Sequence, residues 1–406
     1  MASRKYKDVE LADSKAEMDA PHVALEQQSS VRIGCPVCGF FGSRVVCSAG
    51  DLAAHHRYLE RFYRRRWRVQ NEATAEDRLT FAQNYSTDIV VCLGCGLVYR
   101  HPRSRTDAIV RAYRRERYDD TYLQVEYLSQ RAWARRKFPS VAHRLLRTSR
   151  KEVPRVLEIG SFVGGFLAEG LAHGWDMFGV DPGDDATAFC RALGLPVFCG
   201  TVEEARLNPA SFDAVIIWNT FDQLPDPHPT MTAATRLLRN GGMLVVRVPN
   251  GACFQWAMRT LPRLPARLRS PLQVTLAWNN LLTFPYRYGY ALDTLTNLTE
   301  SHGFRRTGCV PDTLVPASAE HLNLWAVVER HCCNWLCRAV RQAPGLAGQF
   351  PFAPWLDVYF ERACADQEEV RPAARSPSGL GILPVYAPAA LGQTRFNRGV
   401  IEEGRQ

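Results

Sequence analysis

A glycine-rich turn in the middle of the chain limits the fold more than any other feature of the sequence. The segment from Arg155 to Leu167 reads as a short apolar strand, a turn with Gly160 and Gly164, and the start of a helix. Apolar runs separated by helix-length stretches continue this pattern, at residues 155–159, 177–180, 214–218 and 243–248. Strands that alternate with helices predict an α/β domain with a mainly parallel sheet.

The residues around this turn predict a site for a nucleoside cofactor. Turn glycines let the backbone approach a ligand, and the free amides of the following helix favour polar or anionic groups. Asp181-Pro182 ends the next apolar run, where the carboxylate can accept hydrogen bonds from both hydroxyls of a ribose. Phe162 stands where a dinucleotide fingerprint has its middle glycine, which disfavours NAD. Glu158 lies inside a buried strand, so it needs a cationic group such as an amino-acid ammonium.

Two cysteine pairs nearer the N-terminus predict a structural zinc site. They are Cys35-Pro-Val-Cys38-Gly and Cys92-Leu-Gly-Cys95-Gly, and each places two thiolates in one tight turn. Together they supply the four thiolates of a tetrahedral zinc site, whereas a redox pair would need only one of them. A closed shell of four cysteines leaves no open coordination position, so we expect this metal to take no part in catalysis.

With these motifs the chain resembles the class I S-adenosylmethionine-dependent methyltransferases, specifically the bacterial subgroup with an N-terminal zinc-binding segment. The resemblance covers residues 154–330, and the cysteine pairs extend it back to about residue 31. It implies a Rossmann-like sheet of seven strands, mostly parallel, whose last two strands form an antiparallel hairpin near 305–310 and 322–329. The motifs that carry it are Val156 to Phe166, Gly179 to Pro182, Phe212 to Asn219, Leu224 to Pro227, Leu237 to Val245 and Ser301 to Phe304.

The resemblance also implies roles for single residues. Glu158 belongs to the methionine end of the cofactor and Asp181 to its ribose, while residues 200–203 flank the adenine. Residues 218–221 close the site beneath the reactive methyl group. The expected cofactor-binding residues are Glu158, Gly160, Ser161, Gly164, Asp181, Pro182, Thr201 and Asn219.

Methyl transfer from a sulfonium is an in-line displacement, so alignment and desolvation can drive it without an enzymic nucleophile. An acidic acceptor requires a base. Many relatives have Glu-His where this chain has Asp222-Gln223, which removes an obvious base. The candidates are Tyr286, Tyr288, Tyr290, His228 and Asp222, of which we take Tyr288, His228 and Asp222 as the expected catalytic residues.

The function predicted from these residues is methyl transfer from S-adenosylmethionine to a small molecule, with sugars and secondary metabolites as the expected acceptor classes. Two alternatives stay open. The first is a zinc-ribbon binding protein whose cofactor-binding domain is not catalytic. The second is an NAD-dependent oxidoreductase, which the missing fingerprint glycine and Glu158 disfavour.

The acceptor site is expected in the long connection from Asn250 to Tyr290. Long connections after a strand are usually lids or binding loops, and this one follows the carboxyl edge of the sheet. The alternative is that its aromatic residues form the core of an extra helix pair. These residues, which suit a mostly apolar or ring-shaped acceptor, are Phe254, Trp256, Trp278, Phe284, Tyr286, Tyr288 and Tyr290.

The α/β domain is expected at 151–330, within a chain of several parts. Before it we expect a disordered leader at 1–30, a zinc-binding module at 31–104 with a helix over 51–69, and a helical linker at 105–150. After it we expect a helical extension at 331–370 and a disordered tail at 371–406.

Charge and cysteine usage narrow the expected partners. The net charge of +9 comes from residues 100–151, which include 15 basic and 5 acidic residues. Few aromatics surround the cysteine pairs, so nucleic acid is disfavoured as a partner. No apolar window approaches the roughly 18 residues of a membrane helix, so no membrane partner is expected. The 13 cysteines, an odd number spread along the chain, indicate a reducing compartment and a cytoplasmic location. The oligomeric state stays open.

Overall fold

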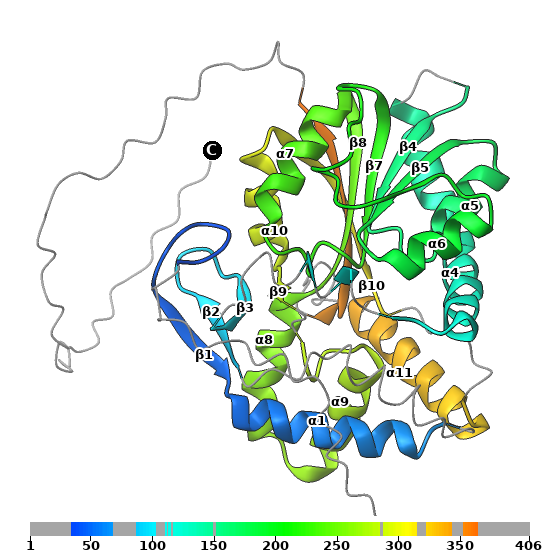
Figure 1. The fold of residues 1–406 in the computed structure, drawn as a ribbon. Helices are drawn as coiled ribbons and strands as arrows, with labels where there is room; N and C mark the ends of the chain where they lie inside the picture. Colours follow the sequence, from blue (N-terminus) through cyan, green and yellow to red (C-terminus); the bar gives the residue numbers. More distant parts are fainter. Residues whose placement is uncertain are drawn as a thin grey trace, which may run out of the picture. The chain divides into compact units, whose positions relative to one another are not determined.

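The structure is a computed structural model that describes residues 34–67, 87–102, 110–111, 113–114, 117–148, 152–284, 287–314, 322–342 and 352–363. Within these ranges the fold consists of a seven-stranded and a four-stranded sheet with their helices (Figure 1). The leader expected at 1–30 and the tail expected at 371–406 lie outside the described residues. Among the described helices, none has the length and apolar character needed to span a bilayer.

The seven-stranded sheet confirms the predicted α/β fold with a mostly parallel sheet. Its strands are, in spatial order, β10 (Phe304–Asp312), β11 (Trp355–Arg362), β8 (Leu238–Pro249), β7 (Phe212–Trp218), β4 (Arg155–Ile159), β5 (Asp176–Asp181) and β6 (Val197–Cys199). The strands from β8 to β6 pair in parallel. Strand β11 is antiparallel to both of its neighbours, β8 and β10.

The antiparallel hairpin at the end of the sheet is present, but its second strand was predicted in the wrong place. Residues 322–329, expected as a strand, contribute to helix α11 (Leu324–Gln342) instead. The strand that pairs with β10 is β11, which lies in the stretch 331–370 that was expected to be helical. The sheet therefore continues beyond the predicted domain boundary at 330.

Helices cover both faces of this sheet (Figure 1). One face packs against α7 (Pro227–Leu237) and α10 (Leu292–Glu300). The other face packs against α5 (Gly165–Ala172) and against α4 (Asp120–Thr148), which lies within the stretch predicted to be helical. Helix α6 (Asp184–Ala192) follows β5. The neighbours Ile217 and Trp218 of β7 belong to different hydrophobic clusters, because successive side chains of a strand point to opposite faces.

The cysteine-bearing region forms the four-stranded antiparallel sheet. Its strands are β1 (Ser43–Cys47), β2 (Asp88–Cys92), β3 (Val98–His101) and β9 (Tyr288–Gly289), in that order. Because β9 comes from the connection after β8, the cysteine-bearing region and the α/β part share this sheet.

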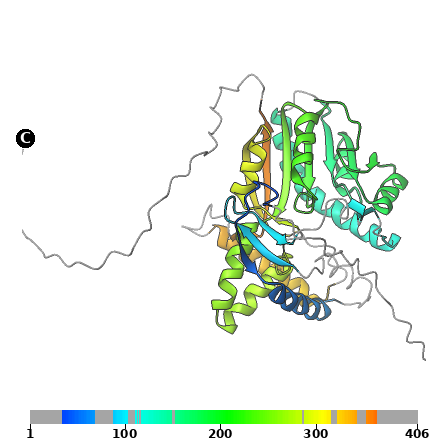
Figure 2. The ribbon, with the colours of Figure 1, turned by 60° about the vertical axis from the view of Figure 1, so that its left-hand side comes forward.

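A hydrophobic cluster packs the helix of the cysteine-bearing region against the connection between β8 and β9. Helix α1 (Ala49–Arg64) confirms a helix in this region but ends at Arg64, before the predicted end at residue 69. The side chain of Ser48 caps its first turn. Helix α1 packs with α8 (Gly251–Thr260) and α9 (Ala266–Trp278), and the turned view of Figure 2 shows α1 in blue beside these light-green helices.

Candidate functional site

A cavity of about 730 Å³ lies at the carboxyl ends of the parallel strands. Its lining includes the residues that follow β4, β5 and β7, among them Gly160, Pro182 and Asn219. In open α/β sheets ligands bind at this edge, and small-molecule sites occupy roughly 300–1,000 Å³. The position and size of the cavity therefore suit a cofactor together with a second small ligand.

Six of the eight predicted cofactor residues line this cavity. Ser161 and Gly164 do not: Ser161 is buried in the turn, and Gly164 is the N-cap of α5 with a φ of 72°. The residues expected beside an adenine, 200–203, are all in the lining. The six residues are Glu158, Gly160, Asp181, Pro182, Thr201 and Asn219.

Glu158 brings a buried carboxylate to the wall of the cavity. Glu158 is only 4% exposed, and its Oε2 has no hydrogen-bond partner among the described residues. Burial raises the pKa of this carboxyl group well above the usual range of a glutamate. A ligand that brings a cationic group would stabilise the charged form, so the site fits the ammonium group of an amino acid.

Asp181 is held in place by the backbone and keeps room for a ligand. Its Oδ2 accepts a hydrogen bond from the amide of Phe162 at 2.8 Å, and its Oδ1 accepts one from the amide of Gly183 at 2.9 Å. Each carboxylate oxygen has two lone pairs, so each can still accept a bond from a ribose hydroxyl. Burial raises the pKa of Asp181, and hydrogen bonds from the ligand would favour its charged form.

The turn after β4 requires the glycine that the sequence places there. Gly160 has a φ of 74°, and a Cβ at this position would lie 2.2 Å from Oγ1 of Thr220. The loop after β7 therefore approaches the loop after β4 so closely that a side chain does not fit between them.

The three expected catalytic residues lie in different environments. Asp222 lines the cavity, is 3% exposed, and has an Oδ1 without a partner among the described residues. Burial raises the pKa of its carboxyl group to about 8. Tyr288 lies in the core, where its hydroxyl donates to the carbonyl of Pro225 at 2.7 Å. His228 contacts His302 and the carbonyl of Val37. Tyr288 and His228 do not line the cavity, so only Asp222 is placed to contact a ligand there.

The expected acceptor wall is present only in part. Trp278 and Phe284 line the cavity, but Phe254, Tyr288 and Tyr290 are buried in hydrophobic clusters. Helices α8 and α9 are present in this connection, so the alternative of an extra helix pair holds for Phe254, whereas Tyr288 and Tyr290 pack in the cluster of the seven-stranded sheet. Tyr286 lies outside the described residues.

Sequence reasoning missed the opposite wall of the cavity. That wall comes from α1 and from residues around α11, and it includes Tyr63, Trp67 and Arg330. These residues lie far from the glycine-rich turn in the sequence, and no local motif marks them. The available signal is the spacing of Leu59, Tyr63 and Trp67, four residues apart in the sequence, which is equally typical of a helix face that packs in a core.

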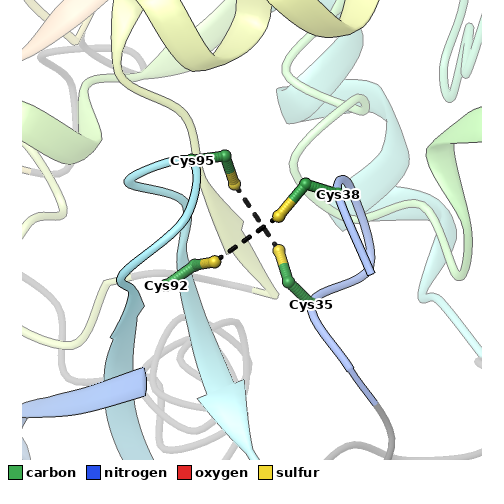
Figure 3. Close-up of side chains that lie close together, drawn as sticks. All are labelled: Cys35, Cys38, Cys92 and Cys95. Atoms are coloured by element: carbon green, nitrogen blue, oxygen red, sulfur yellow. Dashed lines mark hydrogen bonds between the residues drawn. The ribbon is translucent and has the colours of Figure 1, made fainter. Parts of the chain in front are cut away.

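The four cysteines converge on one point (Figure 3). Their Sγ atoms all lie within 4.8 Å of one another, and the Cys35–Cys95 and Cys38–Cys92 Sγ pairs are each 3.6 Å apart. Sulfurs bound to a tetrahedral zinc at about 2.3 Å lie roughly 3.8 Å from each other. The amide of Gly94 also donates to Sγ of Cys92 at 3.3 Å, as suits a thiolate ligand. The cluster therefore fits a structural zinc ion.

A known protein family matches the central part of the chain. Residues 130–307 match a family model described as a methyltransferase domain. A ubiquinone biosynthesis O-methyltransferase of Methylococcus capsulatus is 36% identical over 87 residues, which are 20% of this chain and 37% of that protein. One of the same name from Pectobacterium carotovorum is 30% identical over 115 residues, 26% of this chain and 48% of that protein. The chain thus spans less than half of the length of the curated relatives it matches.

Two solved structures are among those found similar to this chain. A SAM-dependent methyltransferase from Archaeoglobus fulgidus is 19% identical with a TM-score of 0.38, covering 60% of this chain and 100% of that chain. A possible histamine N-methyltransferase from Thermotoga maritima is 17% identical with a TM-score of 0.35, covering 59% of this chain and 90% of that chain. The family match at 130–307 includes the cavity residues from Glu158 to Asn219, whereas the cysteine cluster, α1 and α11 lie outside it.

Proposed function

We propose that this chain transfers a methyl group from S-adenosylmethionine to an oxygen of a small molecule, a proposal supported by the match of residues 130–307 to a methyltransferase-domain family. The observation that carries the proposal is the pair of buried carboxylates, Glu158 and Asp181, at the ends of neighbouring strands in one cavity. Glu158 would hold the ammonium group of the cofactor and Asp181 its ribose, while Thr201 would lie beside the adenine.

When bound, S-adenosylmethionine would supply a methyl group on a sulfonium and would leave as the neutral thioether. The chain itself aligns the acceptor with this group, excludes water and removes a proton. Oδ1 of Asp222 accepts the proton of the acceptor hydroxyl as the new O–CH₃ bond forms. Its carboxylate is the candidate base because it is buried in the cavity wall without a partner among the described residues.

One finding supports transfer assisted by a base, and another supports oxygen as the methylated atom. The pKa of Asp222 is raised to about 8 by burial, which brings it close to the operating range of a general base. The curated relatives carry the name ubiquinone biosynthesis O-methyltransferase, although each matches this chain over a limited length. The sugar and secondary-metabolite classes expected from the sequence are compatible with an oxygen acceptor.

We assign the four-cysteine cluster to a structural zinc ion. The assignment is supported by the Sγ positions of Cys35, Cys38, Cys92 and Cys95, which leave no place for a fifth ligand in a tetrahedral shell. Zinc held there ties the turn at 35–38 to the turn between β2 and β3. It would therefore stabilise the four-stranded sheet without contacting the acceptor.

Isothermal titration calorimetry of the full chain with S-adenosylmethionine, its demethylated product and NAD tests the proposal. We expect micromolar binding of the first two and weaker binding in Glu158→Gln, because the cationic ammonium loses its counter-charge. The exposed Glu152→Gln is the matched control and should bind as the wild type does. Transfer of label from methyl-labelled cofactor to an acceptor then tests the chemistry. Binding of NAD, or no binding of S-adenosylmethionine by the folded protein, would reject the proposal.

A further inference from the structure

Helix α11, drawn in orange in Figure 1, presents an apolar face to the outside of the molecule. Its inner face packs through Ala326 and Cys333 into the hydrophobic cluster that also contains α1, α8 and α9. On the opposite face, Trp325 and Trp335 are 68% and 69% exposed, and the exposed Cys332 lies between them. We call this face the outer stripe of α11, and its large apolar residues are Leu324, Trp325, Val328, Trp335 and Leu336.

Polar contacts on the inner side of α11 keep the outer stripe facing outward. Arg66, in the turn after α1, binds both carboxylate oxygens of Glu329, with Nε to Oε2 at 2.6 Å and Nη2 to Oε1 at 2.7 Å. The indole Nε1 of Trp278 donates to the same Oε2 at 2.9 Å. The amide of Asn323 also donates to the carbonyl of Arg66 at 2.9 Å. The helix therefore cannot rotate to bury its outer stripe without breaking these contacts.

The area of the outer stripe is large for a surface that stays in water. The two exposed tryptophans alone hold roughly 300 Å² of open surface, and the whole stripe holds on the order of 600 Å². This value is at the upper end of the largest apolar patches on monomeric proteins, about 300–600 Å². If two copies covered each other's stripe, they would bury about 1,200 Å² in total, which reaches the lower limit of a specific protein interface.

The order of residues along the outer stripe is that of a surface that can pair with itself. Trp325, Val328, Cys332 and Trp335 follow one another at intervals of three, four and three, which is the spacing of a coiled-coil seam. The order is also symmetric about residue 330, because Leu-Trp at 324–325 is mirrored by Trp-Leu at 335–336. An isologous contact about a two-fold axis requires a patch that is complementary to itself. Two antiparallel copies of α11 meet this requirement, with Trp325 of one beside Trp335 of the other.

The distribution of charge on α11 also favours a second copy. Residues near a two-fold axis face their own copies, so a charged side chain there would meet a like charge. The exposed positions from Leu324 to Leu336 include no Lys, Arg, Asp or Glu, and the exposed Arg338 lies just beyond them. A helix that lies on a membrane surface carries Lys and Arg beside its apolar face. The exposed part of α11 between these two leucines lacks them, so a protein surface of the same composition is the better occupant.

We propose that the chain forms a two-fold symmetric dimer in which the outer stripe of α11 packs antiparallel against the outer stripe of a second copy. Trp325 of each copy contacts Trp335 of the other, and Val328 of each contacts Cys332 of the other. The inference is independent of the proposed methyl transfer. Because α11 also contributes Arg330 to the lining of the cavity, the second copy supports one wall of the cavity from outside.

Sedimentation velocity of the full chain over about 1–100 µM tests the dimer, with a reducing agent present to exclude disulfides through Cys332. We expect a reversible monomer–dimer equilibrium with a dissociation constant in the micromolar range, because the buried area is near the lower limit. Trp325→Glu and Trp335→Arg should each raise this constant at least about tenfold, because a desolvated charge replaces an apolar contact. The double variant with both changes should dimerise at least about tenfold more tightly than either single variant. Only the antiparallel arrangement places each new carboxylate beside the new guanidinium of the other copy.

Leu146→Glu is the matched control, because it places the same charge at a 56% exposed leucine of α4, and it should leave the equilibrium unchanged. The melting temperature of each variant checks that it folds. A wild type that stays monomeric at about 100 µM would overturn the proposal, as would a dimer that persists in folded Trp325→Glu or Trp335→Arg. A double variant that dimerises no better than the single ones would exclude the antiparallel pairing. A monomeric wild type that sediments with vesicles of anionic phospholipid would assign the outer stripe to a membrane surface instead.

Discussion

Nε of Arg247 donates a hydrogen bond to Oδ1 of Asn219 at 3.0 Å, so a guanidinium buried in β8 holds the first residue after β7. Asn219 lines the cavity. Its φ of 51° is a backbone conformation that few residues other than glycine adopt. The remaining nitrogens of Arg247 bind Asp312, Asp357 and the carbonyl of Thr313. The antiparallel end of the sheet is thereby connected to the floor of the proposed active site.

Removing this guanidinium should destabilise the fold. We expect Arg247→Met to lower the free energy of unfolding by about 3 kcal/mol, because the buried carboxylate of Asp357 then keeps only Lys137 as a counter-charge. Urea unfolding of the cofactor-free protein measures the change. The matched control is Arg305→Met, which breaks the exposed pair with Glu361 and should cost less than about 1 kcal/mol. Losses of similar size in both variants would contradict the assigned role of the buried network.

The zinc assignment predicts one metal ion per chain, to be measured by elemental analysis. Cys38→Ser should lose the metal and expose β2 and β3 to hydrogen exchange while β7 and β8 stay protected, because structural zinc contributes on the order of 10 kcal/mol or more to its module. Cys332→Ser changes an exposed cysteine outside the cluster and should keep the full zinc content. A purified wild type that holds no metal and has four freely titrating thiols in the cluster would show the assignment to be wrong.

Asp181→Ala should weaken binding of S-adenosylmethionine by roughly 2 kcal/mol or more, about thirtyfold in the dissociation constant, through lost charge-assisted bonds to the ribose. Calorimetry measures the affinity, and the melting temperature checks that the variant folds without the bonds from Phe162 and Gly183. Asp176→Ala, at the exposed start of the same strand, is the control. An unchanged affinity in folded Asp181→Ala would mean that Asp181 only fixes the turn.

The sequence predicted those parts of the site that short segments build. Cys35 and Cys38 share a turn, as do Cys92 and Cys95, and the following glycines Gly39 and Gly96 have φ values of 72° and 76°. The turn after β4 was equally readable, because strand, glycine and helix start lie within a few residues. Such turns depend on local backbone geometry, and a glycine in the sequence directly indicates where that geometry is required.

The parts that the sequence did not predict depend on partners far apart in the chain. Strand β11 carries Asp357 between apolar residues, and this carboxylate is tolerated in the core because Arg247 on β8 and Lys137 on α4 both pair with it. No pattern near residue 357 reveals these partners. In the same way, Arg330 and Trp67 reach one cavity only after α1 and α11 have packed together.

Asp222 gives the last prediction, which links pH to both activity and stability. If its carboxylate removes the acceptor proton, kcat/KM should rise about tenfold per pH unit and level off near its pKa of about 8. Asp222→Asn should lower kcat by about 10²–10⁴-fold and abolish this ascending limb.

The free energy of unfolding should fall as the pH rises, whereas kcat/KM should rise. Burial raises the folded-state pKa of Asp222 far above the unfolded value near 4, so between about pH 4 and pH 8 the folded chain binds more protons than the unfolded chain. The contribution of the protonated carboxyl to stability is therefore complete below about pH 4 and is lost as the pH rises to about 8. Asp222→Asn cannot ionise, so its melting temperature in the absence of cofactor should exceed that of the wild type by more at pH 9 than at pH 5. Asp293→Asn, an exposed change on α10, should alter neither profile. A melting-temperature difference that is the same at both pH values, together with an ascending limb that persists in Asp222→Asn, would exclude Asp222 as the base.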